Sequence, residues 1–175
     1  MTGNVDFSGD VVFRPPKSNE GLQVHDLIHA GGGLDANSLY CNVLMAHHFA
    51  ATSAVAVSRD DIVGFVTAYR PPDRDDTLFV WQVGVDGAWR GKAIARRLLL
   101  SILDRGSCQS VQYLTATITP TNEASWALFE SAAQALNTSL SKAPLFDSEM
   151  HFGGRHESET EIKIGPISRP TICKA

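Results

Sequence analysis

The residues best suited to bind a phosphorylated cofactor lie where a predicted strand meets a predicted helix. The apolar run Leu78–Val85 predicts the strand, and the helix opens with Arg90-Gly91-Lys92-Ala93-Ile94-Ala95. The first turn of a helix presents unpaired N–H groups and the positive end of the helix dipole. Small residues let a pyrophosphate approach these donors closely, and Arg90 and Lys92 add positive charge. The turn therefore indicates a diphosphate site, although an ordinary helix start with a solvated arginine would contain similar residues.

A second segment, Asn122–Phe129, begins another predicted helix and supports this interpretation. Together the two segments resemble the GNAT superfamily of N-acetyltransferases, whose turn has Gln or Arg, two residues, Gly, one residue, and then Gly or Ala. The chain has Ala93 where that pattern usually has Gly. It has Phe129 where many relatives have a Tyr that protonates the leaving thiolate. Because Phe has no proton to give, another group must protonate the thiolate, or the thiolate leaves unaided.

The resemblance implies how acetyl-CoA binds as the co-substrate. Gly84 in the middle of the strand predicts a bulge, and in the superfamily such a splay lets acetyl-CoA add to the strand edge. Val83 and Val85 would line that edge, and the N–H of Val85 would polarise the thioester carbonyl and stabilise the oxyanion. Asn122 would lie near the pantetheine arm. Trp81 is on the same strand face as Val83, so it can wall the acyl site or simply pack in the core.

Four further segments are more specific than the superfamily pattern, namely Leu34–Tyr40, Phe79–Val83, Thr117–Trp126 and His151–Glu159. Over about residues 10–166 the chain resembles the diaminobutyrate acetyltransferases of ectoine biosynthesis. This resemblance implies acetyl transfer to the N4 amine of L-2,4-diaminobutyrate, a small-molecule diamine, with a homodimer as the usual form. It also implies a set of substrate-binding residues, which are Asp35, Asn37, Tyr40, Trp81, His151 and Glu159.

The charge of a diamine explains why carboxylates and histidines suit this substrate. The reacting amine must first lose a proton, because an alkylammonium with a pKa near ~10 is not nucleophilic at neutral pH. We expect the base among His151, His156, Glu157 and Glu159, and take His156 and Glu157 as the catalytic candidates. Asp35 and the two glutamates can hold the ammonium that does not react. Each carboxylate by itself could equally be a solvated loop acid.

We expect the amine to attack the bound thioester directly, with no covalent enzyme intermediate and no metal. The histidines lack the spacing of metal ligands, and the adjacent His47 and His48 lie on different faces of a helix. Two alternatives stay open. The acceptor could be another polyamine, an amino-acid side chain or a protein N-terminus. The chain could also be a non-catalytic module that binds acyl-CoA, because Ala93 and Phe129 depart from the superfamily pattern.

The elements that must position these residues follow an α/β order. We expect strands at 11–13, 54–57, 62–69, 77–85, 111–118 and 161–164, with loop and short strands between 140 and 161. We expect a helix with Ser18 as its N-cap that runs to Gly31, and a second with Asn37 or Ser38 as its N-cap that runs to Phe49. We expect a third helix from Gly91 to Arg105, and a fourth with Thr121 or Asn122 as its N-cap that runs to Leu136. This order predicts an α/β sandwich around a mixed sheet. The resemblance implies the GNAT fold, whose mixed, mostly antiparallel central sheet is flanked by helices. We expect a single domain at 10–166, with loose ends at 1–9 and 167–175.

Length and composition favour a single soluble domain. The chain has 175 residues, of which 43% are hydrophobic and 19% charged, so it can bury a sizeable core. Its net charge of −4 gives no basic surface for nucleic acid or an anionic membrane. The three cysteines form no CxxC pair, no secretory signal is evident, and no apolar run approaches the ~20 residues that span a bilayer. We therefore expect a cytoplasmic protein.

Overall fold

The computed structural model describes residues 11–31 and 34–168. The predicted loose ends therefore lie outside the described residues, apart from residues 167 and 168, and so do the glycines at 32 and 33. The strands are β1 (Val12–Arg14), β2 (Ala54–Ser58), β3 (Asp61–Tyr69), β4 (Thr77–Val85), β5 (Tyr113–Ile118), β6 (Leu140–Phe146) and β7 (Glu159–Ile164). The helices are α1 (Gly21–Gly31), α2 (Leu39–His48), α3 (Ile94–Leu103), α4 (Glu123–Ala135) and α5 (Ser148–Phe152).

The seven strands form one mixed sheet in the order β1-β2-β3-β4-β5-β7-β6. The β1/β2, β2/β3, β5/β7 and β6/β7 pairs are antiparallel, whereas β4 and β5 are parallel. The predicted mixed, mostly antiparallel sheet is therefore confirmed. The chain divides into two compact units, the first with residues 1–67 and 82–102 and the second with residues 68–81 and 103–175. Both β3 and β4 contribute residues to each unit.

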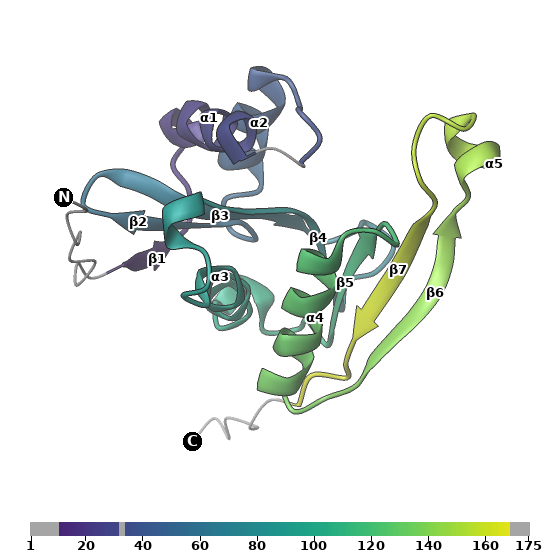
Figure 1. The fold of residues 1–175 in the computed structure, drawn as a ribbon. Coiled ribbons are helices and arrows are strands. Elements are labelled where there is room, and N and C mark those ends of the chain that lie inside the picture. Colours follow the sequence, from purple (N-terminus) through teal and green to yellow (C-terminus); the bar gives the residue numbers. More distant parts are fainter. Residues whose placement is uncertain (1–10, 32–33, 169–175) are drawn as a thin grey trace, which may run out of the picture. The chain divides into compact units, whose positions relative to one another are not determined.

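The first unit has helices on both faces of its strands. Figure 1 shows α1 and α2 on one face of β2 and β3 and α3 on the other. On the first face, α1 packs through Val24 and Ile28 against a core that contains Phe65. On the second face, Gly64 makes room for α3, because a Cβ at this position would lie 3.0 Å from Ile94 Cγ2. Adjacent residues of β3 thus serve opposite helix layers, as the alternation of a strand requires.

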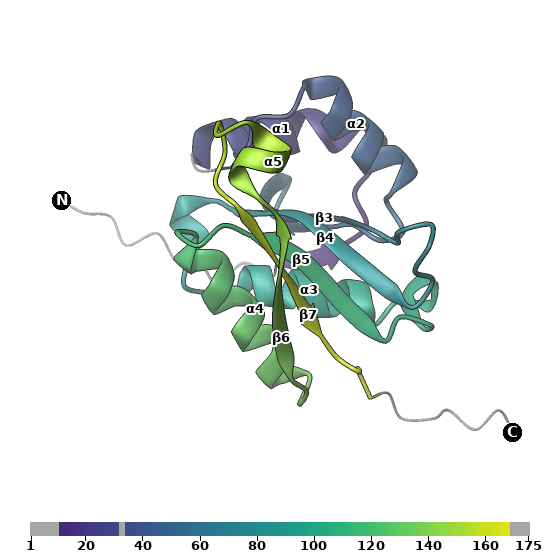
Figure 2. The same ribbon diagram turned by 90° about the vertical axis from the view of Figure 1, so that its right-hand side faces the viewer.

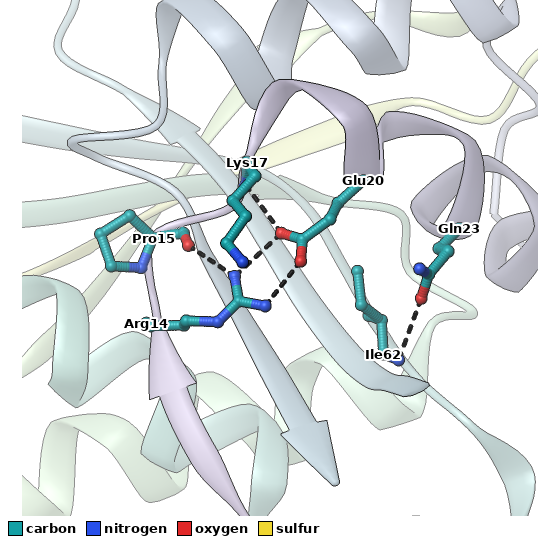
Figure 3. A network of polar contacts seen from close by, with 6 residues as sticks. All are labelled: Arg14, Pro15, Lys17, Glu20, Gln23 and Ile62. Atoms are coloured by element: carbon teal, nitrogen blue, oxygen red, sulfur yellow. Dashed lines mark hydrogen bonds and ion pairs between the residues drawn. The ribbon is translucent and has the colours of Figure 1, made fainter. Parts of the chain in front are cut away.

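A buried carboxylate ties β1 to the start of α1 (Figure 3). Glu20 accepts hydrogen bonds from Arg14 Nη1 and Nη2 at 2.9 and 2.5 Å and from Lys17 N at 2.7 Å. The hydrogen bonds from Arg14 hold the pKa of the Glu20 carboxyl below its ordinary value, and the same contact raises the pKa of Arg14. The predicted helix cap at Ser18 is wrong. Lys17 caps a 3-10 turn (Ser18–Glu20) here, because Glu20 reaches back to its N–H group.

The second unit is built around β5, which pairs with β4 on one side and with β7 on the other. Strands β6 and β7 form a long hairpin, and α5 joins them at its end (Figures 1 and 2). Leu114, Ile162 and Ile164 are fully buried, so β5 and β7 supply core residues to this unit. Helix α4 contacts β6 through Lys142, whose Nζ lies 4.1 Å from the ring centroid of Trp126.

Helices α3 and α5 also differ from the sequence-based prediction. Helix α3 begins at Ile94 rather than at Gly91, because Gly91 and Ala93 have φ angles of +76° and +57° that a right-handed helix excludes. Helix α5 lies in the region predicted as loop and short strands. Its five residues are too few to show a helical period, and Asp147 starts it by accepting two backbone hydrogen bonds.

Candidate active site

The turn after β4 directs backbone donors outward at the start of α3. The chain passes through left-handed φ angles of +76° at Gly91 and +57° at Ala93, both of which are exposed. Ala93 O then accepts the first hydrogen bond of α3, from Arg97 N at 3.0 Å. The N–H groups of Ile94 and Ala95 consequently open toward the turn. This geometry suits a bound anion, and the left-handed φ at Ala93 explains why Gly is usual at that position.

The two cations of the turn are held by local contacts. Arg90 Nε donates to Val85 O at 3.4 Å, and its Nη2 donates to Gly31 O at 3.5 Å. The guanidinium therefore braces the turn against the last residue of β4 and the end of α1. Lys92 Nζ lies 4.8 Å from the ring centroid of Trp89. Both side chains are exposed and carry positive charge at the start of α3, where an anion also experiences the helix dipole.

Near the end of β4, packing explains why residue 84 is a glycine. Val83 and Val85, predicted to line the acetyl-CoA site, are half-buried. A Cβ on Gly84 would lie 2.4 Å from Phe65 Cε1, so the phenyl ring occupies the space that any side chain would need. The close approach of Phe65 accounts for this glycine, whereas the predicted bulge remains a prediction. Ile94 is only 3% exposed, so its side chain anchors the helix and its backbone alone faces the turn.

The connection between α1 and α2, together with the first turn of α2, carries three of the predicted substrate residues. Asp35 and Tyr40 are exposed, and Asn37 is half-buried. Gln82 Nε2 of β4 donates to Asp35 O at 2.9 Å, and Asn37 Nδ2 donates to the same oxygen at 3.5 Å. Ser38 caps α2 with its hydroxyl group, as one of the two predicted caps. The backbone of Asp35 is thus fixed from β4 while its side chain reaches the surface.

Two buried amides that position this connection were missed by the sequence-based reasoning. Besides Gln82, Asn42 of α2 donates from Nδ2 to Ser38 O at 3.4 Å, and the same nitrogen lies 3.1 Å from His25 Nδ1. Gln82 and Asn42 are 7% and 2% exposed. Gln82 could have been identified from the sequence, since it is a glutamine inside an otherwise apolar strand. A polar side chain buried in such a strand requires hydrogen-bond partners, so it indicates a specific contact.

The second unit holds the other predicted residues, beginning with Trp81 and Asn122. Trp81 is 38% exposed, so it does not pack in the core. Asn122 caps α4, where its Oδ1 accepts from Ser125 N at 3.0 Å. Phe129, in the position of the usual tyrosine, is 3% exposed and belongs to the buried face of α4. The residue that replaces the usual acid is therefore a core residue of this unit.

His151 and His156 differ in the ring nitrogen that can accept a proton. His151 Nδ1 accepts a hydrogen bond from Asp147 N at 2.9 Å, so the neutral ring carries its proton on Nε2. His156 Nδ1 lies 2.8 Å from the carbonyl oxygen of Glu157, which can only accept, so this ring carries its proton on Nδ1. The lone pair of neutral His156 is on Nε2, which lies 3.9 Å from Glu159 Oε1. Of the two rings, only His156 is thus arranged to gain a proton beside a carboxylate.

Glu157 itself has a polar partner from the segment before α4. Its Oε2 accepts a hydrogen bond from Thr121 Oγ1 at 2.6 Å, which links the segment after α5 to the cap of α4. Glu157 is exposed and Glu159 is half-buried. His156, Glu157 and Glu159 are therefore gathered in one place within the second unit.

The predicted residues fall into two sets, one in each unit. The first contains the connection from Asp35 to Tyr40, the end of β4 and the turn before α3, and the second contains Trp81, Asn122 and residues 151–159. Within residues 11–31 and 34–168, no three or more His, Cys, Asp or Glu side chains are grouped so as to hold a metal ion. No helix among these residues is long and apolar enough to cross a membrane.

Comparison with known proteins relates these features to one family. The model of the acetyltransferase (GNAT) family matches residues 31–133. The L-2,4-diaminobutyric acid acetyltransferase of Methylotuvimicrobium alcaliphilum is 46% identical over 157 residues, which cover 90% of this chain and 91% of that protein. The protein of the same name from Marinococcus halophilus is 43% identical over 169 residues, which cover 97% of this chain and 98% of that protein.

A solved structure extends the similarity to the fold. The diaminobutyrate acetyltransferase EctA from Paenibacillus lautus, in complex with its substrate L-2,4-diaminobutyric acid and coenzyme A, superposes with a TM-score of 0.87. It is 35% identical in sequence, and the match covers 93% of this chain and 99% of that chain.

Proposed function

This chain belongs to the acetyltransferase (GNAT) family, and we propose that it transfers the acetyl group of acetyl-CoA to the N4 amine of L-2,4-diaminobutyrate. The observation that carries the proposal is the similarity to EctA, which was solved with this diamine and coenzyme A and covers almost the whole chain. The outward-facing donors before α3 support a diphosphate cofactor. The exposed carboxylates of Asp35 and Glu157 support a cationic substrate.

In the proposed complex, the turn Arg90–Ala95 holds the pyrophosphate of acetyl-CoA, and Asn122 lies near the pantetheine arm. Val83 and Val85 line the strand edge beside the thioester. The N–H of Val85 donates to the thioester carbonyl and stabilises the oxyanion that forms on attack. The residues proposed to bind the diamine are those that the resemblance implies, which are Asp35, Asn37, Tyr40, Trp81, His151 and Glu159.

His156 is the base that the local geometry favours. A neutral imidazole with its proton on Nδ1 can take the ammonium proton on Nε2, directly or through water, and Glu159 then stabilises the imidazolium. Glu157 is the second candidate, acting from the carboxylate that accepts from Thr121. The neutral amine attacks the carbonyl carbon, and the new C–N bond leaves a positive charge on the nitrogen. The C–S bond of the tetrahedral intermediate then breaks to release the CoA thiolate, and the nitrogen loses its extra proton to solvent or to the thiolate, which gives the neutral amide.

The buried Phe129 cannot protonate this thiolate. An ordinary thiol has a pKa of about 8.5, so a thiolate is a far better leaving group than an alkoxide and can depart without a dedicated acid. We therefore propose that the CoA thiolate leaves as the anion or takes its proton from solvent.

The test of this function is the range of acceptors. The chain is incubated with acetyl-CoA and, separately, diaminobutyrate, ornithine, lysine and a peptide with a free N-terminus, and release of CoA is followed. We expect diaminobutyrate to react with the highest kcat/KM, and NMR of the product to place the acetyl group on N4. Equal rates for all four acceptors would exclude a dedicated diamine site. Binding of CoA without transfer to any amine would instead identify an acyl-CoA-binding module.

The role of His156 is tested by its pH dependence, with His151 as the matched control. His156→Gln should lower kcat by about 10²- to 10³-fold at neutral pH, because proton transfer by a positioned group contributes at this scale. The deficit should shrink as the pH approaches the amine pKa of ~10, where solvent alone deprotonates the amine. His151→Gln should lower kcat much less. Equal losses in the two variants, or a deficit that does not change with pH, would reject His156 as the base.

We further propose that the chain acts as a homodimer in the cytoplasm and provides an acetylated intermediate for ectoine, an osmoprotectant. These points are supported by the resemblance to the diaminobutyrate acetyltransferases. The oligomeric state is measured by light scattering at micromolar concentration, where a monomer would contradict the proposal.

A further inference from the structure

Gln82 is a buried polar side chain in a strand of otherwise apolar character. It is 7% exposed, and its Nε2 donates to Asp35 O at 2.9 Å. Because a carbonyl oxygen can only accept, this bond fixes the orientation of the amide, with nitrogen toward Asp35 and oxygen away from that carbonyl. Two residues later on the same face of β4, Gly84 lies against Phe65, whose ring belongs to the core shared with α1. Gln82 thus faces the layer of α1 and α2.

The other half of this amide is unsatisfied. Gln82 Oε1 is fully enclosed and has no hydrogen-bond donor among the residues that the structure describes. Almost all buried acceptors in proteins are paired, because desolvating an acceptor without replacing its hydrogen bond is unfavourable. An apolar residue at this position would avoid that cost. The amide oxygen is therefore suited to a donor that a ligand supplies, next to the segment that carries Asp35.

We propose that Gln82 is a specificity-determining residue for the diamine, and that its Oε1 accepts a hydrogen bond from the ammonium group on C2. This proposal rests on the function proposed above. An ammonium has three donors and no acceptor, so it needs several oxygens around it. The carboxylate of Asp35 supplies the opposite charge, and the amide of Gln82 supplies an acceptor that adds no further negative charge.

The chemistry of transfer identifies which ammonium this is. The amine on C4 must be neutral when it attacks, and its lone pair must point at the thioester carbon. The amine on C2 stays charged throughout, so a fixed buried acceptor stabilises it both before and during the reaction. Because Oε1 is enclosed, the ammonium can reach it only if neighbouring atoms shift, while the bond from Nε2 to Asp35 O keeps the backbone of Asp35 next to this amide.

The decisive comparison is between diaminobutyrate and 4-aminobutyrate, which keeps the reacting amine and the carboxylate but lacks the amine on C2. In Gln82→Met, which has a similar size and no amide, kcat/KM for diaminobutyrate should fall about 10- to 100-fold more than kcat/KM for 4-aminobutyrate. The KM for acetyl-CoA should change less than about twofold. Where turnover of 4-aminobutyrate is too slow, dissociation constants measured by calorimetry with CoA present give the same ratio.

Two further variants separate recognition from loss of structure. Gln82→Glu keeps an oxygen acceptor but loses the donor to Asp35, so it should retain most of the preference for diaminobutyrate while lowering Tm. Asn42→Leu removes the other buried amide that holds this connection, so it should lower Tm and weaken both substrates alike. If Asn42→Leu erases the preference as fully as Gln82→Met, loosening of the connection explains the effect and the proposal is wrong.

The remaining outcomes are also distinct. Equal losses for both substrates in Gln82→Met, or no loss for either, would overturn the role of Oε1. A wild-type chain that treats 4-aminobutyrate as well as diaminobutyrate would do the same. If the wild-type chain acetylates neither diaminobutyrate nor 4-aminobutyrate, the proposed function itself is refuted. No result from a Gln82 variant can refute that function.

Discussion

Ala93 offers a direct test of the backbone strain in the turn before α3. The residue has a φ of +57°, in the left-handed region where a Cβ approaches the following carbonyl oxygen. It is exposed, and it accepts the first hydrogen bond of α3 from Arg97 N. Replacing it with glycine removes the methyl group without changing any side-chain contact in the core. Ala93→Gly should therefore stabilise the native protein, although most glycine substitutions destabilise.

The magnitude follows from two opposing terms. The left-handed conformation costs about 1–2 kcal/mol for alanine relative to glycine. Glycine in turn loses about 0.5–1 kcal/mol through the extra freedom of its unfolded chain. The net gain in unfolding free energy is about 0.5–1 kcal/mol. For a chain of this length, such a gain raises Tm by about 1–4 °C.

Thermal unfolding followed by circular dichroism measures this shift, with Ala88→Gly as the matched control. Ala88 is exposed in the 3-10 turn Gly87–Trp89 just before, where its N–H bonds to Asp86, so glycine there should lower Tm. Removal of the Ala93 methyl also opens the approach to the pyrophosphate, so KM for acetyl-CoA should fall or stay constant. A Tm that falls in Ala93→Gly as it does in Ala88→Gly would refute the reasoning about backbone strain.

Three other substitutions test separate contacts. Gly84→Ala should destabilise by about 1–3 kcal/mol in chemical denaturation, because its Cβ would lie 2.4 Å from Phe65 Cε1; an unchanged midpoint would contradict this. Arg90→Ala should raise KM for acetyl-CoA about 3- to 10-fold in steady-state kinetics and leave KM for the diamine constant, because an exposed phosphate contact is screened; the reverse pattern would reassign the turn. Glu20→Gln should lower the unfolding free energy by about 1–3 kcal/mol at neutral pH. Because the Arg14 hydrogen bonds lower the folded pKa of Glu20, its contribution is complete above its unfolded pKa of about 4.3 and is lost as the pH falls through the folded pKa. The wild type and Glu20→Gln should thus converge in acid, and a constant gap in urea titrations at several pH values would exclude this linkage.

The sequence predicted the sheet well because strand patterns are local. The apolar runs at β2, β3 and β4 and the glycine-rich turn after β4 can each be identified from a few neighbouring residues. The start of α3 was placed too early because a left-handed alanine has no local signature, and only the positive φ at Ala93 reveals it. Helix α5 is shorter than two turns, so no apolar period could identify it.

The site was harder to predict than the fold because its geometry depends on which atoms are paired. The sequence does not distinguish His151 from His156 as a base, but the hydrogen bonds at their Nδ1 atoms do. Neutral His156 can gain a proton on Nε2, whereas neutral His151 already carries its proton on Nε2. The resemblance indicated the carboxylates, but the sequence could not predict the hydrogen bond from Thr121 to Glu157. Long-range pairing of this kind is set by the fold and leaves no trace in residue spacing.

Phe129 and Gln82 each depart from a common pattern in polarity, and they do so in opposite directions. At Phe129, where many relatives in the family have a tyrosine hydroxyl, the chain has an apolar ring that is 3% exposed and packs on the buried face of α4. At Gln82, where the strand pattern calls for an apolar residue, the chain has an amide whose oxygen is buried without a donor among the described residues. A thiolate leaves readily without an acid, so a phenylalanine at position 129 has little effect on the reaction. The non-reacting ammonium of the substrate cannot be desolvated without hydrogen-bond acceptors, and Gln82 supplies one. Selection among amines, rather than activation of the thioester, is therefore the demand that these two residues meet.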